Sequence, residues 1–366
     1  MNGGTLKRFY DSAMIAFCLL LGGSFAYAVP LERPRPREKL YVPPWSTEVV
    51  ELATSCKGLS DDECATLRFL VKEVPHAYWV TNETTLAEDL ETLHNILLDA
   101  QKEKRVPTIV IYSLPNRDCG RAMRLSKPFT ASDYKKWGDR IIDALLVYQM
   151  PINVIVEPHG LDEVVTEKYQ RCDHRTRGQV LVERIALLRY MIWGLAERDD
   201  KTKNRKSSKL RIFLDVGGPG RISDARGRLA LVNSIEKILE KAEIDGLSVN
   251  VGGYRSFGES LAWAKTIIGL MKPELARKLT LAIDIGRSGK KVVGTCNSRG
   301  AALDARGSTP DDPDPRVELA IVVKDPSESD GQGEPCNRGA PAGTFDFEVF
   351  KDYLRNSTDT HSSCCN

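Results

Sequence analysis

This sequence of 366 residues lacks the spacings that mark several common kinds of site. No two cysteines are separated by two residues and the five histidines are scattered, so we expect no metal site. Apart from one short run near the N-terminus, no apolar segment approaches the length of a transmembrane helix. The net charge of +2 gives no general attraction for nucleic acid. We therefore expect no metal, no cofactor, no nucleic-acid partner and no membrane contact in the mature form.

The first residues predict a secretory signal peptide. Two basic residues precede the apolar run from Met14 to Leu21, and Ala26-Tyr27-Ala28 has the small-x-small pattern of a cleavage site. The apolar run is too short to cross a bilayer. We expect a secreted, extracellular monomer with this division of the chain: a signal peptide at residues 1–28, a Pro/Arg-rich segment at 29–40, one domain at 41–357 and a short tail at 358–366.

Eight cysteines remain after Cys18 of the signal peptide. An even number of cysteines in an oxidising compartment favours disulfides. Cys56 and Cys64 are close enough in sequence to form a local disulfide. N-glycosylation triplets begin at Asn82 and Asn356, which agrees with secretion, although such triplets also occur by chance.

Short apolar runs alternate with amphipathic stretches along the rest of the chain. The apolar runs are at residues 76–81, 108–114, 152–158, 211–217, 247–253, 279–285 and 318–325. Helical spacing lies between most of them, for example at Tyr134 to Tyr148, Val180 to Ala196, Leu229 to Ala242 and Phe257 to Met271. Strands that alternate with helices indicate a parallel sheet whose crossovers cover it. We predict an α/β fold, a distorted TIM-like barrel of about seven parallel strands, with a doubly wound open sheet as the alternative.

Charged and polar residues follow most of these predicted strands at their carboxyl ends. In parallel α/β barrels this end of the strands carries the active site. A group of carboxylates there is typical of enzymes that hydrolyse glycosidic bonds, in which one carboxylic acid protonates the leaving oxygen. Each carboxylate alone can equally well cap the next helix, but several on one rim favour a site. The residues are Asp118, Glu157, His159, Asp215, Asp284, Arg287, Lys324, Glu328 and Asp330.

The chain contains seven segments in a recognisable order: VIYSLPNRDCG, VIVEPHGL, FLDVGG, IDIGRSG, TCN, VVKDPSESDG and APAGTF. They resemble the signature blocks of glycoside hydrolase family 6, the inverting cellobiohydrolases and endoglucanases that cleave β-1,4-glucan. The resemblance implies a distorted barrel of seven parallel strands, which agrees with the strand count above. It also implies a glucanase-type enzyme whose partner is a β-glucan or a cello-oligosaccharide.

The resemblance assigns roles to residues by their position. Asp118 matches the carboxylate that keeps the family's general acid protonated and helps to organise the catalytic water. His159 stands in the position of that acid, and Asp330 matches a further catalytic carboxylate. The implied substrate contacts are Trp79, Tyr112, Asp215, Asn297, Lys324 and Glu328. The implied disulfides are Cys119 with Cys172 and Cys296 with Cys336.

Several positions depart from the family's pattern. The proton donor of the family is an Asp, whereas this chain has His159. Gly218 and Arg221 stand where the family has a His and a Trp, and Thr295 replaces the Trp before Cys-Asn. Ser113 replaces the Asp that follows the Tyr of the second strand. Losing aromatic faces weakens stacking on the apolar faces of sugar rings.

These departures leave three interpretations of function open. In the first, the chain is an inverting glucanase whose His159 imidazolium donates the proton in mildly acidic surroundings. An ordinary imidazole pKa of about 6.5 is raised by a neighbouring carboxylate such as Asp118. In the second, the activity is impaired or lost and the fold serves as a carbohydrate-binding or interaction protein. In the third, Asp162, one helical turn beyond His159, supplies the acid.

Overall fold

The computed structural model describes residues 38–362 apart from residue 84, residues 117–128, residue 172, residues 202–209, residue 295, residues 305–313, residues 333–335 and residue 337. The chain divides into residues 1–33, which lie outside this described part, and residues 34–366. The predictions on the signal peptide, Asp118, Thr295 and the Cys119–Cys172 disulfide fall outside the described residues.

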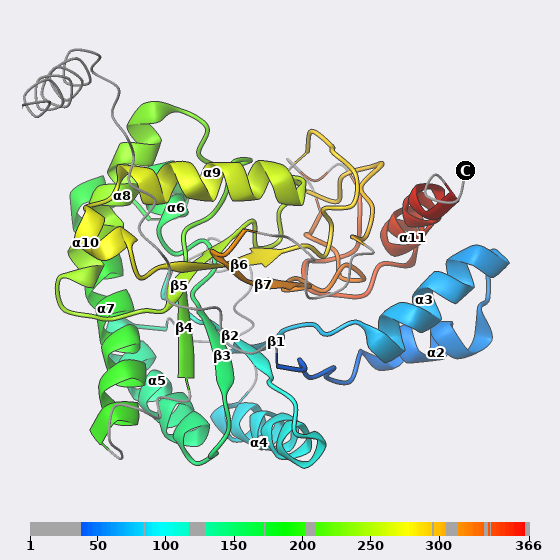
Figure 1. Ribbon diagram of the computed structural model, residues 1–366, viewed down its shortest axis with the longest axis horizontal. Coiled ribbons are helices and arrows are strands. Elements are labelled where there is room, and N and C mark those ends of the chain that lie inside the picture. The colour runs from blue at the N-terminus through cyan, green and yellow to red at the C-terminus, as the bar shows by residue number, and fades with distance from the viewer. Residues whose placement is uncertain are drawn as a thin grey trace, which may run out of the picture. The chain divides into compact units, whose positions relative to one another are not determined.

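The described residues form a seven-stranded sheet in which every neighbouring pair of strands is parallel. The strands lie in chain order from β1 to β7 (Figure 1). This sequential order excludes the doubly wound alternative, in which the strand order reverses within the sheet. All seven predicted strands are confirmed, with the bounds β1 Tyr78–Thr81, β2 Thr108–Tyr112, β3 Ile152–Val156, β4 Leu210–Asp215, β5 Gly246–Val249, β6 Thr280–Asp284 and β7 Val317–Ile321.

The sheet curls so that its first and last strands approach each other. His76, just before β1, and Val322, just after β7, form a parallel bridge. The Ala77 N–H donates to the Val322 carbonyl at 2.8 Å, and the Trp79 indole N–H donates to the Val323 carbonyl at 2.7 Å. The predicted barrel of parallel strands, nearly closed, is confirmed. We call this junction of β1 with the end of β7 the seam.

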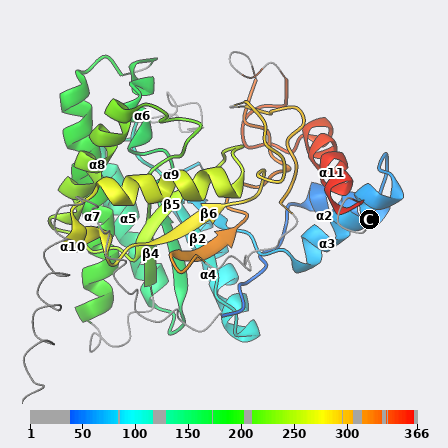
Figure 2. The same ribbon diagram turned by 45° about the horizontal axis from the view of Figure 1, so that its top comes forward.

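Helices begin where the sequence supplies capping residues. Thr85, Thr130 and Ser256 start α4, α5 and α9 with capping boxes, in which the cap and an acidic residue three positions later satisfy each other's backbone N–H groups. The four predicted helices are confirmed as α5, α7, α8 and α9, and α9 packs against β6 (Figure 2). The helix bounds are α2 Thr47–Ser55, α3 Asp61–Glu73, α4 Leu86–Glu103, α5 Ala131–Leu146, α6 Asp162–Val165, η2 Lys168–Arg171, α7 Arg177–Lys201, α8 Ala225–Leu239, α9 Phe257–Leu270, α10 Pro273–Ala276 and α11 Phe347–Ser362.

Alternation along the strands gives the sheet two different faces. On β4, Ile212 packs into the large core beneath the helices, whereas Phe213 packs into a smaller cluster inside the curl. Trp79 and Tyr112 pack against that same inner cluster. Asp215 lies two residues after Phe213, so it faces the inside of the curl at the carboxyl end of its strand.

Two disulfides are present among the described residues: Cys296–Cys336, which the resemblance implied, and Cys56–Cys64, which their spacing allowed. Cys56–Cys64 joins the end of α2 to α3, and Cys296–Cys336 joins two loops that follow β6 and β7. The C-terminal helix α11 packs against α3, so the last helix lies beside one of the first helices of this unit (Figure 1). Within the described ranges, no helix has the length and apolar character needed to cross a membrane.

Candidate active site

The loop after β3 places His159 against the end of β4. The His159 backbone N–H donates to Asp215 Oδ1 at 2.8 Å, and the Gly217 N–H donates to the same oxygen at 3.1 Å. His159 has a φ of 66°, a left-handed conformation that a residue other than glycine adopts only where its surroundings hold it. Two residues that the sequence places 56 positions apart therefore meet at one point.

Asp215 is a buried carboxyl group inside the curl. Its Oδ2 is buried and has no hydrogen-bond partner among the described residues. Burial raises the pKa of Asp215 well above its ordinary value; the His159 N–H opposes this rise and the charge of Asp162 adds to it. Asp215 consequently keeps its proton at pH values at which an exposed aspartate is ionised.

The His159 side chain faces a second buried carboxylate. His159 Nδ1 lies 3.4 Å from Asp162 Oδ2, and Arg221 Nε lies 3.3 Å from the same oxygen. Burial acts to raise the pKa of Asp162, but the positive charges of Arg221 and His159 outweigh burial and hold this pKa below its usual range. An ionised, ion-paired Asp162 has no proton to give, which argues against Asp162 as the acid.

Glu157 and Asp284 bind backbone N–H groups at the ends of their strands. Glu157 is fully buried and accepts hydrogen bonds from the backbone of Ser113 and Leu114, at 2.9 to 3.2 Å. Asp284 is also buried and accepts hydrogen bonds at 2.7 to 3.2 Å from the N–H groups of Gly252, Gly286, Val323 and Lys324. These two carboxylates anchor the loops that carry the site.

Asp330 lies in a polar cluster formed by the loops that follow β5, β6 and β7. Its carboxylate accepts hydrogen bonds from the Tyr254 hydroxyl at 2.5 Å, Arg287 Nη1 at 2.8 Å and the Asn297 backbone N–H at 3.0 Å. Burial acts to raise the pKa of Asp330, but Arg287 and these hydrogen bonds lower it below its ordinary value. Asp330 is therefore an ionised group whose charge Arg287 balances. Sequence reasoning missed Tyr254, although its position directly after a strand run was a signal.

Asn297 and the Lys324–Glu328 pair complete this cluster. The Asn297 side-chain amide donates to Ser329 and to the carbonyls of two loop residues, and its Oδ1 accepts from the Asp330 N–H at 2.8 Å. Asn297 is adjacent to the disulfide-bonded Cys296 and is 2% exposed, so it fixes the loop that carries Asp330. Lys324 Nζ pairs with Glu328 four residues on.

An aromatic pair lies at the start of the curl. The rings of Trp79 and Tyr112 meet edge to face with centroids 4.9 Å apart, and both side chains are half-buried. Each residue points to the inside of the sheet, as does Asp215. An aromatic face beside carboxyl groups is the combination that sugar rings require for stacking and hydrogen bonding.

Backbone contacts join the His159 group to the Asp330 group. The Asn250 N–H donates to the Gly217 carbonyl at 2.8 Å, and the Asn250 side chain donates to the Asp284 carbonyl at 3.1 Å. The Arg287 guanidinium donates to the Gly252 carbonyl. The described members of the predicted rim therefore lie along one edge of the sheet, at the carboxyl ends of its strands.

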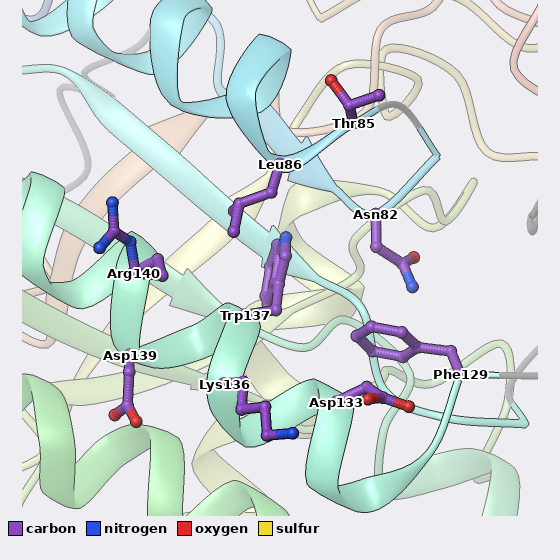
Figure 3. Close-up of a pocket in the computed structure, with 9 residues that line it drawn as sticks. All are labelled: Asn82, Thr85, Leu86, Phe129, Asp133, Lys136, Trp137, Asp139 and Arg140. Carbon is purple, nitrogen blue, oxygen red and sulfur yellow. The ribbon is translucent and has the colours of Figure 1, made fainter.

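A separate cavity of about 650 Å³ lies outside this row of residues (Figure 3). Leu86 and Trp137, which line it, belong to the packing beneath the helices and not to the inside of the curl. Asn82 also lines this cavity and is only 6% exposed, which argues against glycosylation at that triplet in the folded chain. We place the chemistry at the strand ends because the carboxyl groups gather there.

The fold and the site together define the class of the protein. A curled parallel sheet carries buried carboxyl groups and aromatic side chains at the carboxyl ends of its strands. This combination is that of a glycoside hydrolase. The chain belongs to the glycosyl hydrolases family 6, whose family model matches residues 35–357.

Comparisons with individual proteins agree with this family. Endoglucanase A of Cellulomonas fimi is 26% identical over 284 residues, which are 77% of this chain and 54% of that protein. Endoglucanase A of Thermobispora bispora is 24% identical over 280 residues, which are 74% of this chain and 54% of that protein. The chain thus spans about half the length of these curated relatives. The endoglucanase Cel6 structure from Mycobacterium tuberculosis shares the fold, with a TM-score of 0.69, 24% identity, and coverage of 89% of this chain and 99% of that chain.

Proposed function

We propose that this protein is a secreted glucanase that hydrolyses β-1,4-linked glucan with inversion, and that His159 is its proton donor. The observation that carries the proposal is the position of His159, fixed by Asp215 at the strand edge where the family has its acid. The relatives named endoglucanases support the reaction, and the similar Mycobacterium tuberculosis structure is in complex with a thio-linked cello-oligosaccharide. Its partner is a β-glucan or a cello-oligosaccharide, and it acts as a monomer without a metal or cofactor.

The residues take separate parts in this reaction. The His159 imidazolium gives its proton to the glycosidic oxygen as the bond from that oxygen to the anomeric carbon breaks. A water attacks the anomeric carbon from the opposite face, which inverts the configuration. Asp118 receives the proton of this water, directly or through a second water. Asp330 stays ionised beside Arg287, so its part is to hold Arg287, Tyr254 and the loop of Asn297 in place at the site.

Secretion and the remaining contacts belong to the same proposal. The N-terminal segment has the pattern of a signal peptide, and the two disulfides suit an oxidising compartment. Trp79 and Tyr112 provide a face for one sugar ring. Asp215, Asn297, Lys324 and Glu328 bind hydroxyl groups or hold the loops that do so.

A second function has one observation in its favour. Arg221 stands where the family has a stacking Trp, and the structure pairs it with Asp162 instead of leaving an aromatic face. Weaker stacking favours a protein that binds short glucans without cutting them. Variants of His159 distinguish this function from hydrolysis.

The test measures reducing sugar released from soluble β-glucan and cellotetraose between pH 4 and pH 8. We expect the wild type to be active and to lose activity as pH rises, and His159→Ala to lose about 10²- to 10⁴-fold, the usual value of general acid help. The product anomer, observed by NMR, should be inverted. His174→Ala, at an exposed histidine, is the matched control and should retain full activity.

His159→Asp separates the alternatives. If the wild type is inert and His159→Asp is active, the site is an impaired glucanase and His159 is not a donor. If both are inert but bind cellotetraose in calorimetry, the binding function is correct and the proposal is wrong.

A further inference from the structure

Two departures from the family pattern, His159 and Arg221, lie 62 positions apart in the sequence and meet at one carboxylate. Asp162 Oδ2 lies 3.4 Å from His159 Nδ1 and 3.3 Å from Arg221 Nε. The Asp162 side chain is 0% exposed, whereas those of His159 and Arg221 are 15% and 32% exposed. The two cations thus face a carboxylate that solvent does not reach.

The fold holds this carboxylate in place. A Cβ atom at Gly217 would lie 2.9 Å from Asp162 Cβ, so the Asp162 side chain packs directly on a position that only glycine can occupy, at a φ of 80°. The next residue, Glu163, is also buried and pairs with Arg184 of α7 at 3.7 Å. Asp162 is therefore held on a short helix that is anchored on both sides.

We propose that Asp162 is a positioning residue that directs the Nδ1–H of His159 to its own carboxylate and keeps the imidazole ready to donate from Nε2. Nε2 lies on the far side of the ring from Nδ1, so it faces away from Asp162. The same arrangement of carboxylate and imidazole fixes the tautomer and orientation of catalytic histidines elsewhere. This inference rests on the proposed function, because it names the group that prepares His159 for its role.

Arg221 has a part that follows from the proton balance of the step. The proton on Nε2 passes to the glycosidic oxygen, which leaves with the electrons of the broken bond, while water adds to the anomeric carbon and gives its own proton to the base. His159 is then neutral until solvent returns a proton. During that interval Asp162 would be a buried charge without a counter-charge, which is costly. Arg221 keeps it balanced.

The pH dependence of His159 reflects all the charged groups around it. The carboxylate of Asp162 acts to hold the proton of His159, whereas the positive charge of Arg221 at the same carboxylate acts to release it. Removing a negative or a positive group should therefore move the titration of the ring in opposite directions. The charged groups from the elements packed around this pair are Asp162, Glu163, Lys168, Arg184, Asp215, Arg221 and Glu157, with Asp118 outside the described residues.

The first measurement is an NMR titration of His159 in protein labelled with ¹⁵N in its histidines, with the signal assigned by His159→Ala. In Asp162→Asn the ring should titrate at lower pH than in the wild type, and in Arg221→Gln at higher pH. Glu240→Gln is the control, since it removes an exposed carboxylate that pairs with Arg189 at the end of α8, and it should leave the titration unchanged. Equal titration in Asp162→Asn and the wild type would overturn the proposal.

The second measurement compares leaving groups. Acid help matters for cellotetraose, whose leaving group is a poor one, and little for a 2,4-dinitrophenyl cellobioside. The loss of kcat in Asp162→Asn should be at least about tenfold larger on cellotetraose than on the activated substrate. As the pH rises, the activity of this variant should begin to fall at a lower pH than that of the wild type. An equal loss on both substrates would show a merely structural role.

These outcomes separate this inference from the proposed function. If the wild type cuts no glucan, the proposed function fails, but the opposite NMR shifts of Asp162→Asn and Arg221→Gln would still show the pairing. If the wild type is active and the shifts are absent, the pairing is wrong and hydrolysis stands. Should Asp162→Asn fail to fold by circular dichroism, the Arg221→Gln shift to higher pH decides alone.

Discussion

His76 is a buried histidine at the seam, and its protonation should weaken the fold in acid. The residue is 7% exposed, and its ring lies on Trp45 with centroids 4.1 Å apart. Burial lowers the pKa of His76 from 6.5 to about 4, although the backbone of Val74 and the charge of Glu328 oppose this. The folded protein therefore keeps His76 neutral at pH values at which His76 of the unfolded chain is protonated.

The sign and the magnitude of the effect follow from this difference. Below pH 6.5 the unfolded chain binds a proton at His76 and the folded chain does not, so the free energy of unfolding falls as the pH falls. Each pH unit in this window is worth about 1.4 kcal/mol. The loss is about 2 kcal/mol at pH 5 and levels off at about 3 kcal/mol once the pH passes below the folded pKa of about 4.

Urea unfolding at pH 7 and pH 5 measures this loss. Wild type should lose about 2 kcal/mol more than His76→Gln between the two pH values, because the variant has no imidazole to charge. His174→Gln, which changes an exposed histidine, should behave as the wild type does. If His76→Gln and the wild type lose equal stability between these pH values, the folded protein does not keep the proton off His76, and the reasoning is wrong.

Two further substitutions test how the Asp330 cluster is held. Arg287→Met removes one partner of a buried ion pair and leaves the Asp330 charge uncompensated, so urea unfolding should show a loss of about 3–5 kcal/mol; a loss near zero would mean that solvent reaches Asp330. Replacing Cys296 and Cys336 together by serine opens a loop of 40 residues, which should cost about 4 kcal/mol in the chain-entropy model. An unchanged urea midpoint in the double variant would contradict this disulfide's contribution.

The sequence predicted the sheet well because the signal repeats. Each strand is a short apolar run between helical stretches, and seven repeats of one unit leave few topologies. The strand-end side chains were also found, since inward-facing positions such as Asp215 follow from alternation along a strand. The spacing of Cys56 and Cys64 allowed the local disulfide that the structure shows, but it did not decide their pairing.

The roles of these side chains were harder to predict than their positions. In the sequence, Asp284 and Asp330 both look like carboxylates at the end of a strand. In the structure, Asp284 accepts hydrogen bonds from backbone N–H groups, whereas Asp330 pairs with the guanidinium of Arg287. The difference depends on partners from other parts of the chain, which the sequence does not show. The meeting of Asp162 with Arg221 was hidden for the same reason. Neither spacing nor resemblance links two residues on different elements of the chain when one of them, Arg221, differs from the family.

The seam has a consequence for how the chain folds. Every strand pairs with its predecessor, so most of the sheet can assemble unit by unit as the chain emerges. The hydrogen bond from Trp79 to Val323 instead joins residues 244 positions apart, and it must wait for β7. Until then β1 presents an open edge that can pair with another chain. Nascent or truncated chains that end before β7 should therefore be prone to aggregate, and they would lack the loop of Lys324 and Asp330, so the site is completed last.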